Sequence, residues 1–271
     1  MDIKIILVYC LCADLLIALQ HREDRQCQMS DAEVMTTAIV AALFFGGKYE
    51  RARELLQEQG YIPTMLSKSQ FSRRLHRLDH LFVTLFQVLG ESFKDLNEES
   101  VYILDSAPVA VCDNIRIGRN KIYGTEAYRG YQASKKRYFY GVKIHLLVTK
   151  DHQPVEFFLT PGSCSDTSAL EQFDFDLPAG AWIFGDRAYT FYLVEDLLAE
   201  AEMHLVAQRK KNAKRSLPSW LRSLLAHYRN QVETAGSLIE RLLPKSIHAI
   251  TAKGFELKVM LFTLASSINC L

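Results

Sequence analysis

Three acidic residues have the types and the spacing that could support a metal-dependent reaction at a phosphodiester. Asp105 ends the apolar run VYILD, Asp186 ends AWIFGD, and Glu233 lies in YRNQVETAGSLIERLL, which has a helical pattern. Eighty residues lie between the first two acids and 46 between the last two, so only a folded chain could bring them together. Converging carboxylates can bind two Mg²⁺ (or Mn²⁺) ions, which activate one oxygen and stabilise another during an in-line displacement at phosphorus.

Other polar residues compete for these roles. Asp113 lies beyond the first apolar run, where a cap or a partner contact is favoured, and Glu240 lies two helical turns from Glu233 on a similar face. Glu233 is preferred because it lies one turn from Arg229 and beside small residues that would let a helix approach a sheet.

Two further residues have a structural interpretation that is favoured over a catalytic one. Asp166 follows LTPGSCS at the start of a helix, and we expect it to cap that helix and not to contact a metal. His145 lies in a strand pattern, where a lone histidine is more often a packed core residue.

Residues 1–95 have the pattern of an all-helical N-terminal domain. The segment IKIILVYCLCADLLIAL is shorter than the roughly 20 residues that cross a bilayer and contains Asp14, so we expect a buried helix and no membrane partner. Ser30 and Glu33 form a capping-box pattern that opens a helix ending at Phe45. A second helix is expected over 49–59, before Gly60.

A third helix is expected from Ser67 through residue 93, with apolar residues at spacings of three and four. Its basic side chains include Arg73 and Arg74. Two interpretations stay open: a helix-turn-helix that presents these arginines to DNA, and a helical bundle with a solvated basic face.

From residue 96 the pattern changes to strands alternating with helices. Strands are expected at 101–105, 138–149, 154–160, 181–185 and 203–208, and helices at 166–173, 190–202 and 219–243. The turn DHQP predicts a hairpin between the second and third strands. The later alternation of strand and helix predicts parallel strands with right-handed crossovers.

Five segments in this order resemble DDE transposases of bacterial insertion sequences. They are LDSAPVAVCDN, YFYGVKIHLLV, LTPGSCSD, FGDRAY and YRNQVET. The resemblance covers roughly 95–271 and implies a ribonuclease-H-like α/β fold, in which a mixed sheet is flanked by helices, with Asp105, Asp186 and Glu233 as catalytic and metal-binding residues of a domain spanning 96–271. In a helix pattern of such enzymes, Arg229 and Glu233 fit the arginine and glutamate, whereas Ala226 and Glu240 stand at the tyrosine and lysine positions. Arg241 is a nearby substitute for that lysine.

Two clusters of basic residues could bind DNA. They lie in the long connection after the first strand, where tyrosines are interleaved with them, and in QRKKNAKR after the last strand. With Arg73 and Arg74, the predicted DNA contacts are Arg116, Arg119, Lys121, Lys135, Lys136, Arg137, Lys143, Arg209, Lys210, Lys211, Arg229 and Arg241. Solvated charge on two loops is the alternative.

The composition restricts the remaining possibilities. A net charge of +1, 49% hydrophobic residues and 23% charged residues are typical of a globular chain and exclude a uniformly basic DNA-coating protein. Six cysteines without a CxxC pair indicate free thiols in a reducing cytoplasm, and not a disulfide framework or a zinc site.

These observations together predict an insertion-sequence transposase that binds terminal inverted repeats and catalyses metal-dependent strand cleavage and transfer. The resemblance implies that its partners are double-stranded DNA, at the element ends and the target, and further copies of itself as a homodimer or multimer. Two alternatives are a metal nuclease that only hydrolyses and an inactive DNA-binding protein derived from a transposase. The three acids argue against the inactive alternative, because an inert scaffold needs none of them.

Overall fold

The chain forms two compact units in a computed structural model that describes residues 1–24, 26–113, 118, 120–132, 136–210, 212–228, 243–244 and 246–271. Unit 1 is Met1–Leu89 with Leu242–Leu271, and unit 2 is Gly90–Arg241. These ranges differ from the expected 1–95 and 96–271 chiefly at the C-terminus. The last helix packs with the N-terminal helices, because twelve of its residues are buried and it contacts the second helix of the chain.

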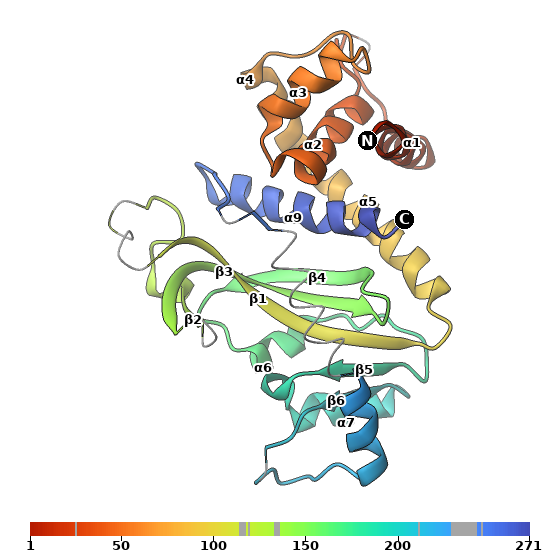
Figure 1. Cartoon of the computed structure of the whole chain (residues 1–271), viewed down its shortest axis with the longest axis vertical. Helices are drawn as coiled ribbons and strands as arrows, with labels where there is room; N and C mark the ends of the chain where they lie inside the picture. Colours follow the sequence, from red (N-terminus) through yellow and green to blue (C-terminus); the bar gives the residue numbers. More distant parts are fainter. Residues whose placement is uncertain are drawn as a thin grey trace. The chain divides into compact units, whose positions relative to one another are not determined.

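Unit 1 is helical, as expected. It contains α1 (Asp2–Ala18), α2 (Asp31–Phe45), α3 (Tyr49–Glu58), α4 (Lys68–Arg77), the first part of α5 (Asp79–Leu96) and α9 (Ala252–Asn269), as Figure 1 shows. Helix α2 contacts α1, α3, α4 and α9, and its apolar composition on nearly every face suits this central position.

The ends of α2 form as the sequence predicts. The Ser30 hydroxyl accepts a hydrogen bond from the Glu33 N–H at 3.1 Å, and the Glu33 carboxylate accepts one from the Ser30 N–H at 2.7 Å. Gly46 ends the helix in the left-handed region, with φ of +57°, which glycine adopts without steric cost.

Two expectations for unit 1 were wrong in detail. The segment 67–93 is not one helix, because the chain bends at Leu78 between α4 and α5. Helix α1 is buried on one face only, since Ile5 and Val8 are in the core while Ile3 and Ile17 are exposed. Within the described part of the chain, no helix combines the length and the apolar character needed to cross a membrane.

Unit 2 is built on one mixed sheet. Its strands are β1 (Val101–Asp113), β2 (Arg129–Gln132), β3 (Arg137–Thr149), β4 (Pro154–Pro161), β5 (Trp182–Gly185) and β6 (His204–Ala207), drawn from yellow to teal in Figure 1. The order across the sheet is β2-β3-β1-β5-β6, and β4 pairs with the edge of β3 beyond the part that pairs with β2.

The directions of the strands confirm the predicted fold class. Strands β1, β3 and β4 are antiparallel neighbours, and the β3–β4 hairpin is the one predicted from DHQP. Strands β5 and β6 run parallel to β1. Leaving β2 aside, the order β4-β3-β1-β5-β6 is the mixed arrangement expected for a ribonuclease-H-like sheet, flanked by helices and preceded by a helical region.

Short helices connect the later strands of unit 2. They are α6 (Asp166–Ala169), η3 (Leu170–Gln172), η4 (Arg187–Tyr189) and α7 (Tyr192–Glu200), with η2 (Glu126–Tyr128) before β2. The helix predicted at 219–243 is present over 219–228, and the rest of that range lies outside the described residues. Its Leu225 packs with Val101, Phe184 and Val206, so this helix covers one face of the parallel strands.

The C-terminal half of helix α5, which belongs to unit 2, packs against the sheet. A Cβ atom on Gly90 would lie 2.7 Å from the carbonyl oxygen of Val155 on β4. Glycine at this position therefore permits the close approach of helix and strand, which no larger residue would allow without a shift of backbone.

Candidate active site

Asp105 and Asp186 lie side by side in unit 2 because of the register of two parallel strands. Leu104 of β1 is paired with Gly185 of β5, and each acid is the next residue along its strand. Asp105 does not end its strand, as the sequence suggested, since β1 continues to Asp113. It lies instead where the pairing of β1 with β5 ends, and there the sheet opens between the two acids.

Hydrogen bonds from nearby backbone hold both carboxylates. The Ser106 N–H donates to Oδ1 of Asp105 at 2.8 Å, and the Ala188 N–H donates to Oδ1 of Asp186 at 2.7 Å. Asp186 thereby caps η4, the short helix that follows it. Among the described residues, the second carboxylate oxygen of each side chain has no hydrogen-bond partner and is open to another ligand.

Asp166 is a third acid of this site, and its predicted role as a helix cap was wrong. Ser165 is the cap of α6, because its side chain accepts the hydrogen bond from the Ser168 N–H at 3.0 Å. The Asp166 carboxylate instead accepts a hydrogen bond from the Ser106 hydroxyl at 2.9 Å. Lys143 of β3 lies 3.3 Å from the same oxygen and also donates to the Cys164 carbonyl at 2.7 Å.

Desolvation and neighbouring acids make the charges of Asp105 and Asp186 unfavourable, although Asp186 is exposed at the surface. Desolvation, with smaller effects of Asp186 and Asp166, raises the pKa of Asp105 to about 7. Desolvation, together with the charge of Asp166, also raises the pKa of Asp186. Among the described residues, no lysine, arginine or histidine forms an ion pair with either acid, whereas Asp166 is paired with Lys143.

The donor set of this site fits a divalent metal ion. Asp105 and Asp186 offer oxygen atoms, the ligands that Mg²⁺ and Mn²⁺ prefer, and a cation between them would relieve their repulsion. Asp166 adjoins them but is already neutralised by Lys143. Asp105 and Asp186 are therefore the described residues best suited to bind a metal here.

Two residues border the acids, and neither was predicted to be part of the site. Tyr189, at the end of η4, is 1% exposed; its hydroxyl makes no hydrogen bond of good geometry with a described residue, but the Ser106 side chain is near enough to lower its pKa. Desolvation and the charges of the three acids raise its pKa. Ser106 was missed because nothing in its sequence context suggests that it bridges Asp105 to Asp166, whereas Tyr189 could have been suspected from its place three residues after Asp186.

His145 is a packed core residue, as the sequence favoured. It is fully buried, its Nε2 lies 2.9 Å from the Thr160 hydroxyl, and its ring stacks on Phe158 with centroids 5.0 Å apart. Desolvation lowers its pKa to about 4, so the imidazole is neutral near pH 7.

The predicted DNA contacts of unit 2 differ in their exposure to solvent. Lys121, Lys136, Arg137 and Lys210 are exposed. Lys143 lies in the acid site, as described above. Arg209 differs from the expectation, because both of its terminal nitrogens bind the Glu195 carboxylate at 2.7 and 2.5 Å, in a pair of which each side chain is about 10% exposed.

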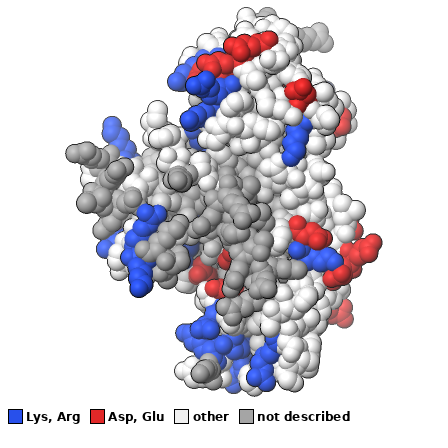
Figure 2. All heavy atoms as spheres, in the orientation of Figure 1, with Lys and Arg blue, Asp and Glu red and all other residues white. Residues whose placement is uncertain are grey.

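In Figure 2, lysine and arginine side chains gather at the end of unit 2 that carries the loop after β6. The exposed Lys210, Lys214 and Arg215 belong to this loop, and Arg215 is paired with Asp196 at 2.6 Å. The loop therefore presents positive charge although Arg209 is engaged.

In unit 1 the two predicted arginines of α4 differ. Arg73 is exposed. Arg74 is not available to DNA, because its guanidinium group donates to the Met29 carbonyl and forms an ion pair with Asp31. The helix-turn-helix interpretation stays a prediction.

Several predicted residues lie outside the described part of the chain. They are Glu233, Arg116, Arg119, Lys135, Lys211, Arg229 and Arg241, together with the competing Glu240 and the side chain of Asp113.

Comparisons with known proteins place the site in a family. Residues 96–249 match the family described as the transposase DDE domain, which is more than half of the chain. The ribonuclease-H-like sheet and the paired acids define a class of proteins in which carboxylates lie together where two neighbouring inner strands stop pairing. Within that class, the chain belongs to the DDE transposase domain family.

Similar solved structures are more distant. A piggyBac transposase synaptic complex with hairpin DNA is 10% identical with a TM-score of 0.49, and the similarity covers 97% of this chain and 70% of that chain. A Mos1 transposase paired-end complex with the left transposon end is 11% identical with a TM-score of 0.26, covering 80% of this chain and 81% of that chain. No curated protein matches the sequence. At these values the family assignment depends on the match over 96–249.

Proposed function

We propose that the protein is the transposase of a bacterial insertion sequence, which cuts DNA at the ends of its element and joins those ends to target DNA. The observation that carries the proposal is the adjacency of Asp105 and Asp186 at the end of the β1–β5 pairing, inside the range that matches the transposase DDE domain. Neither acid forms an ion pair with a described residue, and the charge of Arg187 lowers the pKa of Asp186 without reversing its rise.

Glu233 is proposed as the third catalytic acid, although it lies outside the described residues. Tyr228, five residues earlier in the chain, stacks on Phe184 of β5 with ring centroids 4.6 Å apart. Phe184 is two residues before Asp186, so the helix that leads toward Glu233 is docked on the strand that carries the second acid. This contact supports Glu233 over a more distant carboxylate.

Asp105, Asp186 and Glu233 would bind Mg²⁺ or Mn²⁺. Such ions, when bound, supply charge stabilisation at the phosphorus atom and lower the pKa of an attacking water or hydroxyl. The protein residues orient this chemistry: Ser106 and the η4 backbone fix the two carboxylates, and Asp166 with Lys143 fixes Ser106.

The exposed Lys121, Lys136, Arg137 and Lys210 of unit 2, and Arg73 of unit 1, are proposed to contact double-stranded DNA through its phosphates. We infer that two or more copies act together on paired element ends. The similar piggyBac and Mos1 structures are a synaptic and a paired-end complex of those proteins.

The test is cleavage of labelled DNA that carries the sequences flanking the gene, with Mg²⁺ or Mn²⁺ present. Asp105→Asn should lower the cleavage rate at least about 1,000-fold while DNA binding is kept, because only the metal-dependent step is lost. Asp176→Asn is the matched control, since this aspartate of unit 2 has a side chain that is 85% exposed.

A nick at a defined end, followed by joining to a second duplex, supports the transposase. Cleavage without joining would indicate a nuclease that only hydrolyses. Binding of the ends with no cleavage by the wild-type protein would indicate an inactive DNA-binding protein and contradict the proposal.

A further inference from the structure

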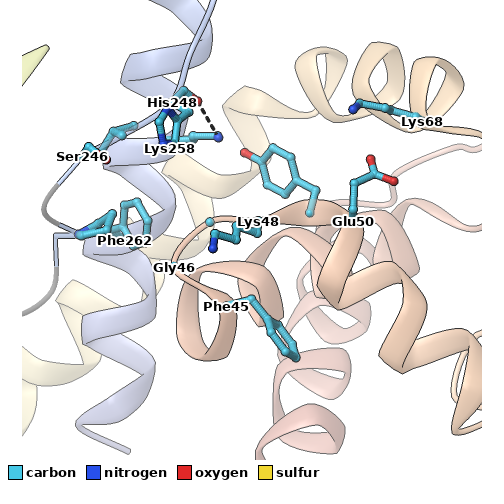
Figure 3. Close-up of a pocket in the computed structure, with 13 residues that line it drawn as sticks. Phe45, Gly46, Lys48, Glu50, Lys68, Ser246, His248, Lys258 and Phe262 are labelled. Atoms are coloured by element: carbon cyan, nitrogen blue, oxygen red, sulfur yellow. Dashed lines mark hydrogen bonds between the residues drawn. The ribbon is translucent and has the colours of Figure 1, made fainter.

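Unit 1 contains a pocket that has no part in the acid site. Its volume is about 590 Å³, within the usual range for small-ligand sites, and Figure 3 shows it in close-up. The lining comes from the turn between α2 and α3, the start of α4, the segment around Ser246 and His248, and α9. All of these residues belong to unit 1.

The charge on the pocket wall is mainly positive. Lys48, Lys68 and Lys258 line it from three different elements, as Figure 3 shows. The acid on the wall, Glu50, is already paired with Arg53 at 2.7 Å. The pocket therefore offers ammonium groups to a ligand without a free carboxylate beside them on the described wall, which favours an anion.

Lys258 is the most deeply placed of these lysines. It is partly buried, and desolvation lowers its pKa. Its Nζ donates to the His248 carbonyl at 2.7 Å and lies 5.1 Å from the ring centre of Tyr49. Because an ammonium group has three N–H donors, an anion in the pocket could accept another of them.

Tyr49 is a partly exposed aromatic ring on the wall. Phe262 also lines the pocket but is only 2% exposed, so it forms the floor and not a stacking surface. Gly47 makes room for Phe262, since a Cβ atom on Gly47 would lie 2.9 Å from Cζ of that ring, and its φ of +75° also favours glycine.

The start of α3 adds to the preference for a phosphate. Lys48 is the N-cap of this helix, and no described side chain caps it, whereas α2 and α4 both begin with capping boxes. The first N–H groups of a helix carry partial positive charge and bind anions. This feature acts together with the lysines at the same opening.

We propose that this pocket binds a nucleotide monophosphate unit, with the phosphate at the lysines and the base against Tyr49. The nucleotide could be the unpaired end of a DNA strand or a free nucleotide. A base stacked on an aromatic ring and a phosphate paired with lysine is the usual combination in single-strand binding. The inference rests on the proposed function, because a protein that cuts DNA generates strand ends.

The test compares two labelled duplexes by fluorescence anisotropy, one with a 5′-phosphorylated single-stranded overhang and one with blunt ends. Deoxynucleoside monophosphates are added as competitors. Lys258→Gln and Lys68→Gln should each weaken binding of the overhang duplex roughly 5- to 10-fold, since each removes a charged contact to phosphate. Lys253→Gln is the control, because this lysine is also on α9 but pairs with Asp79 at 2.6 Å and does not line the pocket.

The control should bind within about twofold of the wild-type protein. Tighter binding of the overhang that free nucleotides do not displace assigns the pocket to strand ends, and displacement by free nucleotides at low concentration assigns it to those ligands. Equal binding of overhang and blunt duplexes, without effect of free nucleotides, would overturn the inference. So would an equal loss in the Lys253 control.

Lys68 is exposed in the first turn of α4, so its variant reports on binding even if Lys258→Gln folds poorly. Normal cleavage by the wild-type protein, together with no preference for the overhang, would contradict the pocket and leave the proposed function standing. Absence of cleavage, together with a clear preference for the overhang, would contradict the proposed function and support the pocket.

Discussion

Asp31 in unit 1 and Asp105 in unit 2 are both acids largely withdrawn from solvent, yet their neighbours differ. Asp31 forms an ion pair with the guanidinium group of Arg74, and its other oxygen lies 2.9 Å from Nε2 of His21. Asp105 has the Ser106 N–H as its hydrogen-bond donor and Asp186 and Asp166 as charged neighbours. The first acid is neutralised by neighbouring side chains, whereas no cation of the described residues is paired with the second.

The comparison also shows why a group of possible ligand atoms is not enough to indicate a metal site. His21, Glu23 and Asp31 have ligand atoms within 4.8 Å of one another. However, Arg74 already forms an ion pair with Asp31, and a metal ion bound there would lie beside the positive charge of Arg74. Removal of one partner from such a buried pair is costly, whereas the pair itself adds little stability. We therefore assign the cluster of unit 1 to structure and the acids of unit 2 to function.

The largest expected effect tests whether Asp31 is a structural acid that depends on Arg74. Arg74→Ala should lower the free energy of unfolding by about 3–5 kcal/mol, because it leaves Asp31 buried without its cation. Chemical denaturation measures this loss. Arg73→Ala on the same helix is the control and should change stability by less than about 0.5 kcal/mol, since Arg73 is exposed. Equal effects of the two substitutions would show that Arg74 has no special structural role.

Substitution of Asp166 tests whether the metal-binding site includes residues beyond Asp105 and Asp186. Asp166→Asn should slow metal-dependent cleavage roughly 10- to 100-fold, because groups that orient metal ligands contribute effects of this size. Lys143→Met should act in the same direction. Isothermal titration with Mn²⁺ separates the roles: a positioning residue changes metal affinity, whereas a purely structural one changes only the unfolding transition. An unchanged affinity would remove Asp166 from the site.

The pH dependence of stability gives a smaller effect. The pKa of Asp105 rises from an ordinary value of 3.8 to about 7 in the folded protein, so the folded state binds more protons than the unfolded state between these values. Metal-free protein should therefore lose stability as pH rises from about 4 to about 7 and then level off.

Asp105→Asn should flatten this part of the stability curve and stabilise the metal-free protein at pH 8, by something on the order of 1–2 kcal/mol. Asp186 leaves a residual slope, because its pKa is also raised. Thermal unfolding across the pH range measures both. Destabilisation of Asp105→Asn at pH 8 would mean that Asp105 is a structural acid like Asp31, and would contradict the distinction between the two acids.

The smallest effect concerns Tyr189. Its buried hydroxyl makes no hydrogen bond of good geometry with a described residue and interacts only weakly with the Ser106 side chain, so Tyr189→Phe should change the free energy of unfolding by at most about 1 kcal/mol. Thermal unfolding without metal measures it. A loss of several kcal/mol would instead mean that the hydroxyl has a partner which holds the acids in place.

Local signals in the sequence were enough for many elements. The capping boxes at Ser30 and Ser67 involve residues three apart, so a few neighbouring side chains fix where α2 and α4 begin. The hairpin of β3 and β4 was predicted from a short turn between two apolar runs. The positions of the candidate acids Asp105 and Asp186 after apolar runs were also readable, because strands buried in a sheet carry continuous apolar residues.

Other features depended on contacts between distant parts of the chain. Nothing in SRRLHRLDHL marks the bend at Leu78, since apolar spacing continues through it and neither glycine nor proline interrupts it. Strand β2 was missed because its four residues lie in a long polar connection, and it forms by pairing with the start of β3. The place of α9 in unit 1 follows from a match of apolar surfaces with α2 that sequence order does not indicate.

The fold class, the strands other than β2 and the candidate acids Asp105 and Asp186 could be predicted from the amino-acid sequence. These depend on local pattern and on a resemblance carried by short motifs. Which charged groups neutralise one another depended on tertiary contacts. Arg74 and Arg209 were predicted to contact DNA and are paired with Asp31 and Glu195, whereas Asp166 was predicted to be a cap and lies beside the candidate acids. The physical reason is that electrostatic energy depends on distance and burial, and both are set by residues far apart in the chain.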